Sequence, residues 1–429
     1  MSIPGNANPL LLASAAAGAD AAAAGPIKSV RFNNDDSAYL NRSATDSGSD
    51  VYKYTVSWWM KIGSIGTDKT IVSFATNNAV NGWTKIHLRT DNRLSIFGDS
   101  SGTALSIRPT MLFRDPSAWY HCVVSLDTTE STYSDQAKFY INGVQQTDFT
   151  GTLAFAQNTS LSIGEATTHH VGVEPNSLGT LRNYFDGYIA DLYVVEGAIL
   201  QASDFGAFDD NGVWQAAAYS GTYGTNGFHL LDFANESTVG HDSSGNENDF
   251  TANNISTAAG AGNDILIDTP TNYTAGSGNN GGNYCTWSPL VVSDYTPSSS
   301  QLVNGNLEGN ANKWYFGTQA FNTGKWYWEL TEVTNSGIGV YDINAPKGAG
   351  DRQSHSVVLF PDPAFQGVGT KPTAFTYSNT DVIGLALDAD ANTLAYYKNG
   401  TLQGTVTNLP SNKSWTPFIA WNSSGATAA

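Results

Sequence analysis

The stretch VYKYTVSWWMKI, residues 51–62, decides the fold class because its apolar side chains recur at every second position. Successive side chains of a β-strand point to opposite faces, so this spacing predicts a strand with one buried face. The members of that face are Tyr54, Val56, Trp58, Met60 and Ile62.

Similar patterns follow along the chain. WYHCVVSLD (residues 119–127) repeats the alternation, and KFYINGVQ (residues 138–145) places Asn142 and Gly143 between two short strands. Both residues of an Asn-Gly pair adopt positive φ readily, which makes the pair a strong hairpin signal. With LSIG (residues 161–164) and YFDGYIADLYVVEGAIL (residues 184–200), these motifs form a series of strands typical of a β-sandwich.

The composition agrees with an all-β protein that buries a large core. The 429 residues are 40% hydrophobic and include 11 Trp, 20 Tyr and 19 Phe, while 43 Gly and 15 Pro supply many turns. A length of 429 residues predicts two or three domains. Twenty Lys and Arg against 38 Asp and Glu give a net charge of -18, without a run of cations, so we expect no nucleic-acid partner.

The two cysteines, Cys122 and Cys285, are too few for a disulfide framework or a Cys-based zinc site. Whether they contact each other is left open. Stability is therefore expected to come from packing.

The motifs of the first half end in the block F-D-G-x-I-x-D at residues 185–191. Their order resembles a laminin-G or concanavalin-A-like domain, which we place at residues 28–208. The resemblance implies a two-sheet jelly roll whose rim loops bind glycans or proteins, in some members with calcium.

The last third of the chain carries a second set of motifs. KWYWE (residues 325–329) alternates, and VIGLALDADANTLAYYKNG (residues 382–400) predicts strands joined by turns, the last at Asn399 and Gly400. This order resembles a SPRY (B30.2-like) domain, which we place at residues 284–429. The resemblance implies a second antiparallel sandwich with a protein-binding surface of variable loops.

Residues 209–283, rich in Gly, Asn, Ser and Thr, are expected to be a connector with short strands. Its segments DSSGNENDF, NNIS and DTPTNY resemble a connector of virion proteins from marine tailed phages. Asp242, Ser244 and Asn246 present oxygens at alternating positions, a spacing that can wrap a calcium ion. The alternative, which we favour, is an Asx or type I turn that caps its own backbone.

Residues 1–27 are Ala-rich with a short apolar centre. The first lysine is Lys28, so the cationic start of a secretory signal is missing, and with Asp20 inside it the segment is too short and polar to span a bilayer. We expect an extended or helical docking segment that contacts other virion proteins or copies of the chain. Its apolar centre is Pro9, Leu10, Leu11 and Leu12.

No arrangement of catalytic residues is visible. Glu329 and Glu332 are three positions apart, so a strand would point them to opposite faces, and Asp186 and Asp191 also differ by an odd number. The adjacent His169 and His170 are expected in a solvated loop. We assign no catalytic residue and expect a protein that is not an enzyme.

Aromatic residues outside the alternating core faces are the better candidates for ligand binding. Trp59 lies opposite Trp58 in its strand, Trp83 lies in a polar stretch, and Tyr341 with Asp342 follows IGV. An exposed aromatic ring can stack on a sugar while a nearby Asp or Asn takes its hydroxyls. The alternative, which we favour, is that a loop or partner covers these rings.

Arg352 and His355 are clustered in the second domain, in the stretch GAGDRQSH. They are expected to contact a protein carboxylate or to pair with Asp351. No cofactor is expected, apart from the calcium alternative above.

These expectations together favour a structural protein of a bacteriophage virion, made in the cytoplasm of the bacterial host. It would be a tail fibre or similar appendage, a homo-oligomer that attaches to a host-surface glycan or protein and does not insert into a membrane. A capsid decoration protein is the alternative, and a secreted glycan-active enzyme is less favoured.

Overall fold

The structure, a computed structural model, describes residues 28–75, 83–100, 103–153, 155–176, 178–230, 239–259, 262–270, 282–290, 302–309, 313–331, 333, 336–347 and 351–421. The chain forms two compact units, Met1–Tyr284 and Cys285–Ala429. The docking residues Pro9, Leu10, Leu11 and Leu12 lie outside the described residues. None of the helices among the described residues has the length and apolarity to cross a membrane.

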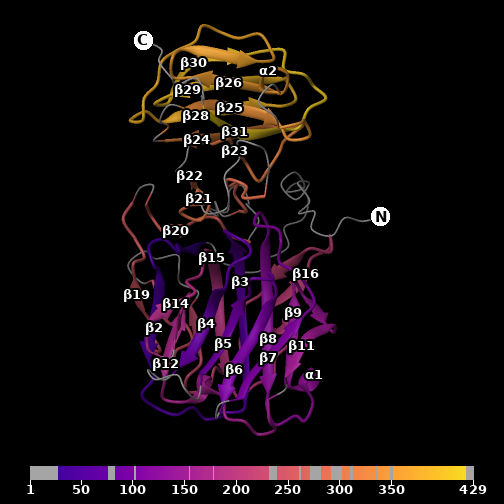
Figure 1. The fold of residues 1–429 in the computed structure, drawn as a ribbon, viewed down its shortest axis with the longest axis vertical. Helices are drawn as coiled ribbons and strands as arrows, with labels where there is room; N and C mark the ends of the chain where they lie inside the picture. The colour runs from indigo at the N-terminus through magenta and orange to yellow at the C-terminus, as the bar shows by residue number, and fades with distance from the viewer. Residues whose placement is uncertain are drawn as a thin grey trace. The chain divides into compact units, whose positions relative to one another are not determined.

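The first unit is a sandwich of two eight-stranded antiparallel sheets (Figure 1). The first sheet has the order β10-β9-β8-β3-β15-β1-β20, and β18 also pairs with β15. Its strands are β1 (Ser29–Phe32), β3 (Lys53–Ile62), β8 (Trp119–Asp127), β9 (Ala137–Ile141), β10 (Val144–Gln146), β15 (Gly187–Glu196), β18 (Phe228–Leu230) and β20 (Ile265–Leu266).

The second sheet has the order β11-β7-β6-β5-β4-β12-β2-β19. Its strands are β2 (Tyr39–Ser43), β4 (Lys69–Ala75), β5 (Trp83–Leu88), β6 (Leu94–Ser100), β7 (Thr103–Pro109), β11 (Phe149–Leu153), β12 (Thr168–Val171) and β19 (Thr251–Asn253). Short elements connect or cover these strands: α1 (Tyr133–Gln136), the 3-10 turns η2 (Ser162–Gly164) and η3 (Ala202–Asp204), β13 (Glu174–Pro175), β14 (Leu181–Arg182), β16 (Gly206–Phe208) and β17 (Trp214–Ala216).

The apolar face predicted for residues 51–62 lies in the core between these two sheets. Trp58 and Met60 are fully buried there, together with Ile96 of the second sheet. The predicted hairpin turn also forms, because Asn142 and Gly143 have φ of 47° and 80°. The prediction of an all-β fold is confirmed by this sandwich and by the sheets of the second unit.

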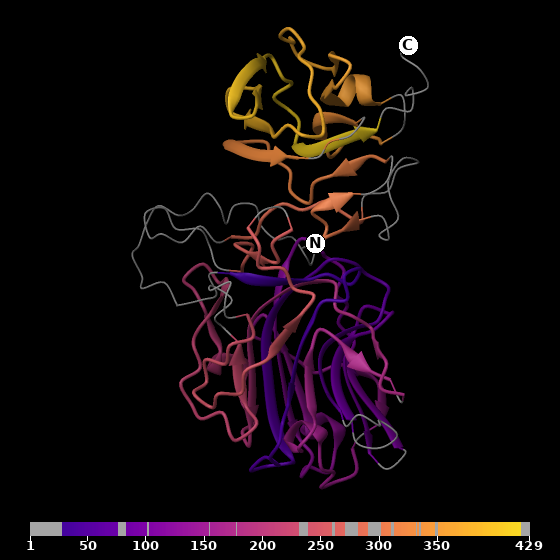
Figure 2. The same ribbon diagram turned by 90° about the vertical axis from the view of Figure 1, so that its left-hand side faces the viewer.

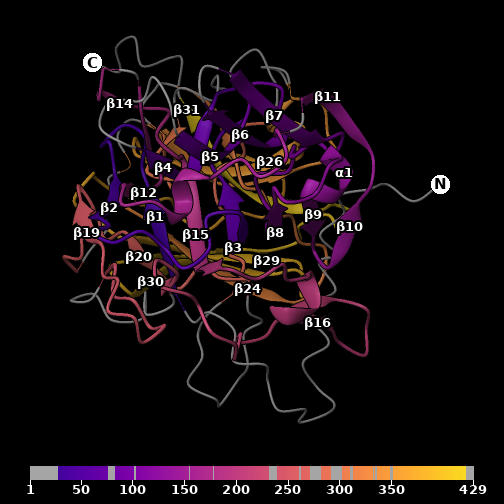
Figure 3. The same cartoon turned by 90° about the horizontal axis from the view of Figure 1, so that it is seen from below.

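The first sheet is covered on its outer face as well. Tyr193 of β15 packs with Phe205, and Trp59 of β3 packs with Trp214 of β17. Figure 3 shows the resulting layers, with β4 to β7 on one side of β3, β8 and β15, and β16 on the other side.

Residues that we expected to form a connector contribute strands to this sandwich. β18 pairs with β15, β19 pairs with β2, and β20 pairs with β1, all antiparallel. An edge strand with unpaired backbone groups favours such pairing. The compact first unit accordingly extends to Tyr284.

The second unit contains a five-stranded sheet, β23-β31-β25-β26-β27, and a four-stranded sheet, β24-β28-β29-β30 (Figure 2). Residues of both sheets, such as Val340 of β25 and Leu385 of β28, share one core. A second buried cluster includes Trp314, Tyr341 and Phe418. The elements are β21 (Leu302–Val303), β22 (Glu308–Gly309), β23 (Tyr315–Phe316), β24 (Lys325–Leu330), β25 (Ser336–Asp342), α2 (Arg352–His355), β26 (Ser356–Phe360), β27 (Ala364–Gly367), β28 (Ile383–Asp388), β29 (Thr393–Lys398), β30 (Thr401–Val406) and β31 (Trp415–Trp421).

Candidate functional site

The outer face of the second sheet in the first unit gathers aromatic and cationic side chains. In β5, Ile86 and Leu88 point into the core, so the alternating Trp83, Lys85 and His87 lie on the outer face. The cross-strand register adds residues from β6 and β7 to this face. We call the set the Trp83 face: Trp83, Lys85, His87, Phe97 and Arg108.

Trp83 and Phe97 form an aromatic pair on this face. Their ring centroids are 4.9 Å apart with an angle of 39° between the ring planes. The Nζ atom of Lys85 lies 5.1 Å from the centroid of Trp83 and 5.6 Å from that of Phe97, within the range of cation–π contacts. Both aromatic residues are half-buried, so part of each side chain faces solvent.

Lys85 is held in place by a short hairpin of β13 and β14. Lys85 Nζ lies 2.5 Å from Glu174 Oε2, and Arg182 Nε lies 3.3 Å from Glu174 Oε1. The backbone oxygen of Val173 accepts a hydrogen bond of 2.9 Å from Ser73 Oγ of β4, which fixes the hairpin to the sheet. Burial lowers the pKa of Lys85, and the charge of Glu174 opposes this effect.

His87 lies beside this group and is only 3% exposed. Its pKa is well below the ordinary value, because of its burial and the nearby charges of Lys85, Arg89 and Arg108. Among the described residues, neither ring nitrogen of His87 nor Nε of Arg108 has a hydrogen-bond partner. His87 is therefore a neutral imidazole at neutral pH.

This arrangement is suited to binding. An aromatic surface can take the apolar side of a sugar ring, and hydrogen-bond donors beside it can take the hydroxyl groups. The side chain of Arg182 is 52% exposed and supplies such donors. Glu174 is fully buried, and its carboxylate is engaged by Lys85, Arg182 and the side-chain amide of Asn183.

Trp59 is not an exposed aromatic ring, and the alternative that another segment covers it holds for this residue. Trp59 is only 4% exposed, and its ring packs against His121 with centroids 4.8 Å apart. Trp214 of β17 stacks on the same His121 ring, with ring centroids 5.8 Å apart. The cover of the first sheet's outer face therefore removes Trp59 from the surface.

His169 and His170 are also placed differently from the expectation. They belong to β12, which pairs with β2 on one side and β4 on the other. His169 is fully buried and His170 is 7% exposed. Both are strand residues and not solvated loop residues, because β12 is an interior strand of its sheet.

Asp242, Ser244 and Asn246 form the backbone-capping turn that we favoured. Asp242 Oδ1 accepts the backbone N–H groups of His229 and Ser244, and its Oδ2 accepts the hydroxyl of Ser244 at 2.8 Å. Asn246 Nδ2 donates to the backbone oxygens of Gly224 and Gly227. Among the described residues, no group of three His, Cys, Asp or Glu side chains is placed to hold a metal ion.

In the second unit, Tyr341 does not present its ring to a ligand. Tyr341 is fully buried in an aromatic cluster, and its hydroxyl donates to the backbone oxygen of Pro346. The reason is that Tyr341 belongs to β25, whose second face is also covered.

Asp342 and His355 contact the same lysine in the second unit, and Arg352 contacts an aromatic ring. Asp342 Oδ2 is 2.9 Å from Lys413 Nζ, which in turn lies 3.2 Å from His355 Nδ1. The guanidinium of Arg352 stands 4.9 Å from the ring centroid of Phe360, and burial lowers its pKa. The structure thus joins Asp342 and His355 through Lys413, a residue that sequence reasoning missed.

Sequence reasoning also missed most of the Trp83 face. The alternation of Trp83, Lys85 and His87 with apolar residues in WTKIHL is visible in the sequence and was a usable signal. Glu174 and Arg182 carry no such signal, because only the folded hairpin brings them to β5.

The fold and this face define a β-sandwich protein with a surface suited to binding. Residues 32–203 match a laminin G family model described as the Concanavalin A-like lectin/glucanases superfamily. The jelly-roll fold that the sequence predicted for this region is thereby confirmed.

Several solved structures are similar to parts or most of the chain. A native heptameric SAP-like pentraxin from Limulus polyphemus is 19% identical over 40% of this chain and 77% of that chain, with a TM-score of 0.30. Domains LG4-5 of the mouse laminin alpha1 chain are 10% identical over 94% of this chain and 84% of that chain, with a TM-score of 0.34. The SPRY domain of human HERC1 is 16% identical over 25% of this chain and 77% of that chain, with a TM-score of 0.22. The curated proteins contain no significant match.

Proposed function

We propose that this protein is a recognition component of a bacteriophage virion and that its first unit binds a host-surface glycan through the Trp83 face. The observation that carries the proposal is the half-buried pair of Trp83 and Phe97 around the fixed ammonium group of Lys85. The description of the matched family, which names lectins, supports the same class of ligand.

The chemistry of the Trp83 face fits a weak, repeated contact. One sugar stacked on an aromatic pair binds at about millimolar Kd, or about -4 kcal/mol. Many copies on one particle raise the overall affinity by roughly 10² to 10⁴ without a new contact. A homo-oligomeric tail fibre or similar appendage provides such repetition.

A place in the virion is supported by the sequence of the first unit's last third. The segments DSSGNENDF, NNIS and DTPTNY resemble virion proteins of marine tailed phages, and a net charge of -18 disfavours adhesion to packaged DNA. In this proposal the protein is made in the bacterial cytoplasm and assembles onto other virion proteins through residues 1–27. We further propose that it binds and does not cleave its glycan.

Replacing Trp83 with Ala is expected to weaken glycan binding about tenfold, which corresponds to about 1.4 kcal/mol of lost stacking. Titration of glycans that bind the wild-type chain on an array measures this change. Tyr327→Ala is the matched control, because Tyr327 is an exposed aromatic residue of the second unit. Equal affinities of wild type and Trp83→Ala would remove the Trp83 face from the proposal.

The virion role is tested by locating the chain in purified particles. The protein should sediment with the particles, in tens of copies for a fibre and in hundreds for a capsid decoration. A chain found only in the host cytosol would refute the virion role. New reducing ends after incubation with a bound glycan would refute the proposal that the protein does not cleave it.

A further inference from the structure

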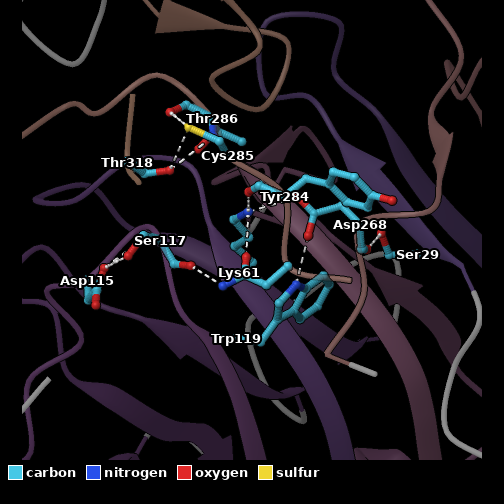
Figure 4. Close-up of polar contacts among 11 residues, drawn as sticks. Ser29, Lys61, Asp115, Ser117, Trp119, Asp268, Tyr284, Cys285, Thr286 and Thr318 are labelled. Atoms are coloured by element: carbon cyan, nitrogen blue, oxygen red, sulfur yellow. Dashed lines mark hydrogen bonds and ion pairs between the residues drawn. The ribbon is translucent and has the colours of Figure 1, made fainter. Parts of the chain in front are cut away.

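A buried lysine at the end of β3 contacts a carboxylate and a carboxamide at the same time. Lys61 is 1% exposed, and its Nζ lies 2.8 Å from Asp268 Oδ2 and 3.0 Å from Asn283 Oδ1 (Figure 4). A third contact of 2.8 Å joins Nζ to the backbone oxygen of Tyr284. All of these residues belong to the first unit.

Aromatic side chains surround this group. The indole N–H of Trp119 donates to Asp268 Oδ1 at 2.9 Å, and Lys61 Nζ lies 5.6 Å from the ring centroid of Tyr188. Trp119 and Tyr188 are both buried. These side chains exclude water from the contact between Lys61 and Asp268, whose side chains are 1% and 7% exposed.

The carboxamide of Asn283 is oriented by its own hydrogen bond. Its Nδ2 donates to the backbone oxygen of Ser117 at 2.7 Å, so its oxygen faces Lys61. The hydroxyl of Ser117 in turn donates to Asp115 Oδ1. Nζ is therefore next to the oxygen that is bonded to Cγ, while the nitrogen that would leave points elsewhere.

We propose that Lys61 and Asn283 form an intramolecular isopeptide bond, with Asp268 moving the protons. The side chains are held at contact distance before any reaction, which is the condition under which an intramolecular attack becomes efficient. Once an adjacent carboxylate has taken a proton from the lysine ammonium group, the free amine is a nucleophile.

The reaction balances without an oxidant or a co-reactant. Asp268 takes a proton from the Lys61 ammonium group, and the free amine attacks Cγ of Asn283 while the carbonyl electrons move to Oδ1. A second proton passes from Nζ to Nδ2, the Cγ–Nδ2 bond breaks, and ammonia leaves. The products are a secondary amide between Nζ and Cγ, one ammonia, and Asp268 in its acid form, which then returns its proton to solvent or to the ammonia.

The test is the intact mass of the purified full chain under denaturing conditions. The expected mass is lower than the sequence mass by one ammonia, about 17 Da, and a protease digest should contain a branched peptide that joins Lys61 to Asn283. An intact mass equal to the sequence mass, or a digest with only linear peptides at both residues, would overturn the proposal. This measurement uses the wild-type chain and does not depend on how a variant folds.

Variants show which residues are responsible for the loss of ammonia. Asn283→Ala and Lys61→Met should have the full sequence mass, and Asp268→Asn should keep the full mass while its circular dichroism spectrum stays that of a β protein. Lys53→Met is the matched control, because Lys53 lies on the same strand but pairs with Asp127 near the surface, at 38% exposure, and this variant should still lose one ammonia.

A succinimide at an Asn-Gly site, such as Asn142 and Gly143, also loses ammonia. Hydroxylamine cleaves a succinimide and leaves an isopeptide bond intact, so the loss should survive this treatment. A loss of ammonia that persists in Asn283→Ala would assign the mass change to another site and would refute the proposal.

Discussion

Acidification from pH 7 to pH 5 should lower the free energy of unfolding of the first unit by at least about 6 kcal/mol, and the buried, neutral His87 adds to this loss. Burial lowers the pKa of His121 and His169 to about 3 and that of His170 to about 4, from an ordinary value of 6.5. The unfolded chain binds these protons below pH 6.5, whereas the folded chain does not. Each histidine therefore removes about 2 kcal/mol of stability by pH 5, and none of this effect is present above pH 7.

The hydrogen bonds of His121 show why its folded form resists protonation. Its Nδ1 accepts the indole N–H of Trp214 at 2.9 Å, so its Nε2 carries the proton toward Ser57 Oγ. A second proton on Nδ1 would face that N–H group and break the contact. The charge of Arg42 acts in the same direction on His169.

Urea unfolding at pH 7, 6 and 5 measures this change, and the slope of stability against pH gives the number of protons taken up on unfolding. His169→Gln should reduce the slope by about a quarter, because His87, His121 and His170 also take up a proton each on unfolding. His241→Gln is the control that should leave the slope unchanged, because the side chain of His241 is 49% exposed. Equal stability at pH 7 and pH 5 would contradict the buried neutral state of these histidines.

Asp264→Ala is expected to lower the free energy of unfolding of the first unit by about 3–5 kcal/mol. Arg31 Nε and Asp264 Oδ1 are 2.8 Å apart, and the side chains are only 2% and 5% exposed. Asp264 Oδ2 also accepts the backbone N–H of Ser256 at 2.6 Å. Removing the carboxylate takes from the buried guanidinium the negative charge that Asp264 supplies.

Chemical denaturation of the variant measures the loss. The double variant Arg31→Met with Asp264→Leu should recover most of it, because an apolar pair of similar size carries no buried charge. Lys53→Met is the matched control, since the ion pair of Lys53 with Asp127 is partly exposed and its loss should cost less than about 1 kcal/mol. A loss of less than about 1 kcal/mol in Asp264→Ala would show that Arg31 is rehydrated when its partner is removed.

The fold was predictable where the pattern is local. Residues 51–62 alternate with period two over a whole strand, and the Asn142–Gly143 turn depends on the two residues that form it. β18, β19 and β20 have three, three and two residues, which is too short for a period to be seen. Their place in the sandwich follows from pairing with distant strands.

The candidate site was predictable only in part. Trp83 was named from the sequence, but whether an aromatic ring is exposed depends on segments far along the chain. Trp59 shows this, because the cover over it comes from residues around Trp214. For the same reason the sequence did not indicate that Glu174 would hold Lys85, or that Asn283 would meet Lys61.

The pairing of β1 with β20 has a consequence for protein engineering. Ser29 of β1 pairs with Leu266 of β20. The first and the last strand of this sandwich along the chain are therefore neighbours at one edge of the same sheet. A short linker from the end of β20 to the start of β1, with new termini opened at the β9–β10 turn, therefore gives a circular permutant that keeps every strand neighbour. The order of the strands along the chain is thus separable from their arrangement in the sheets.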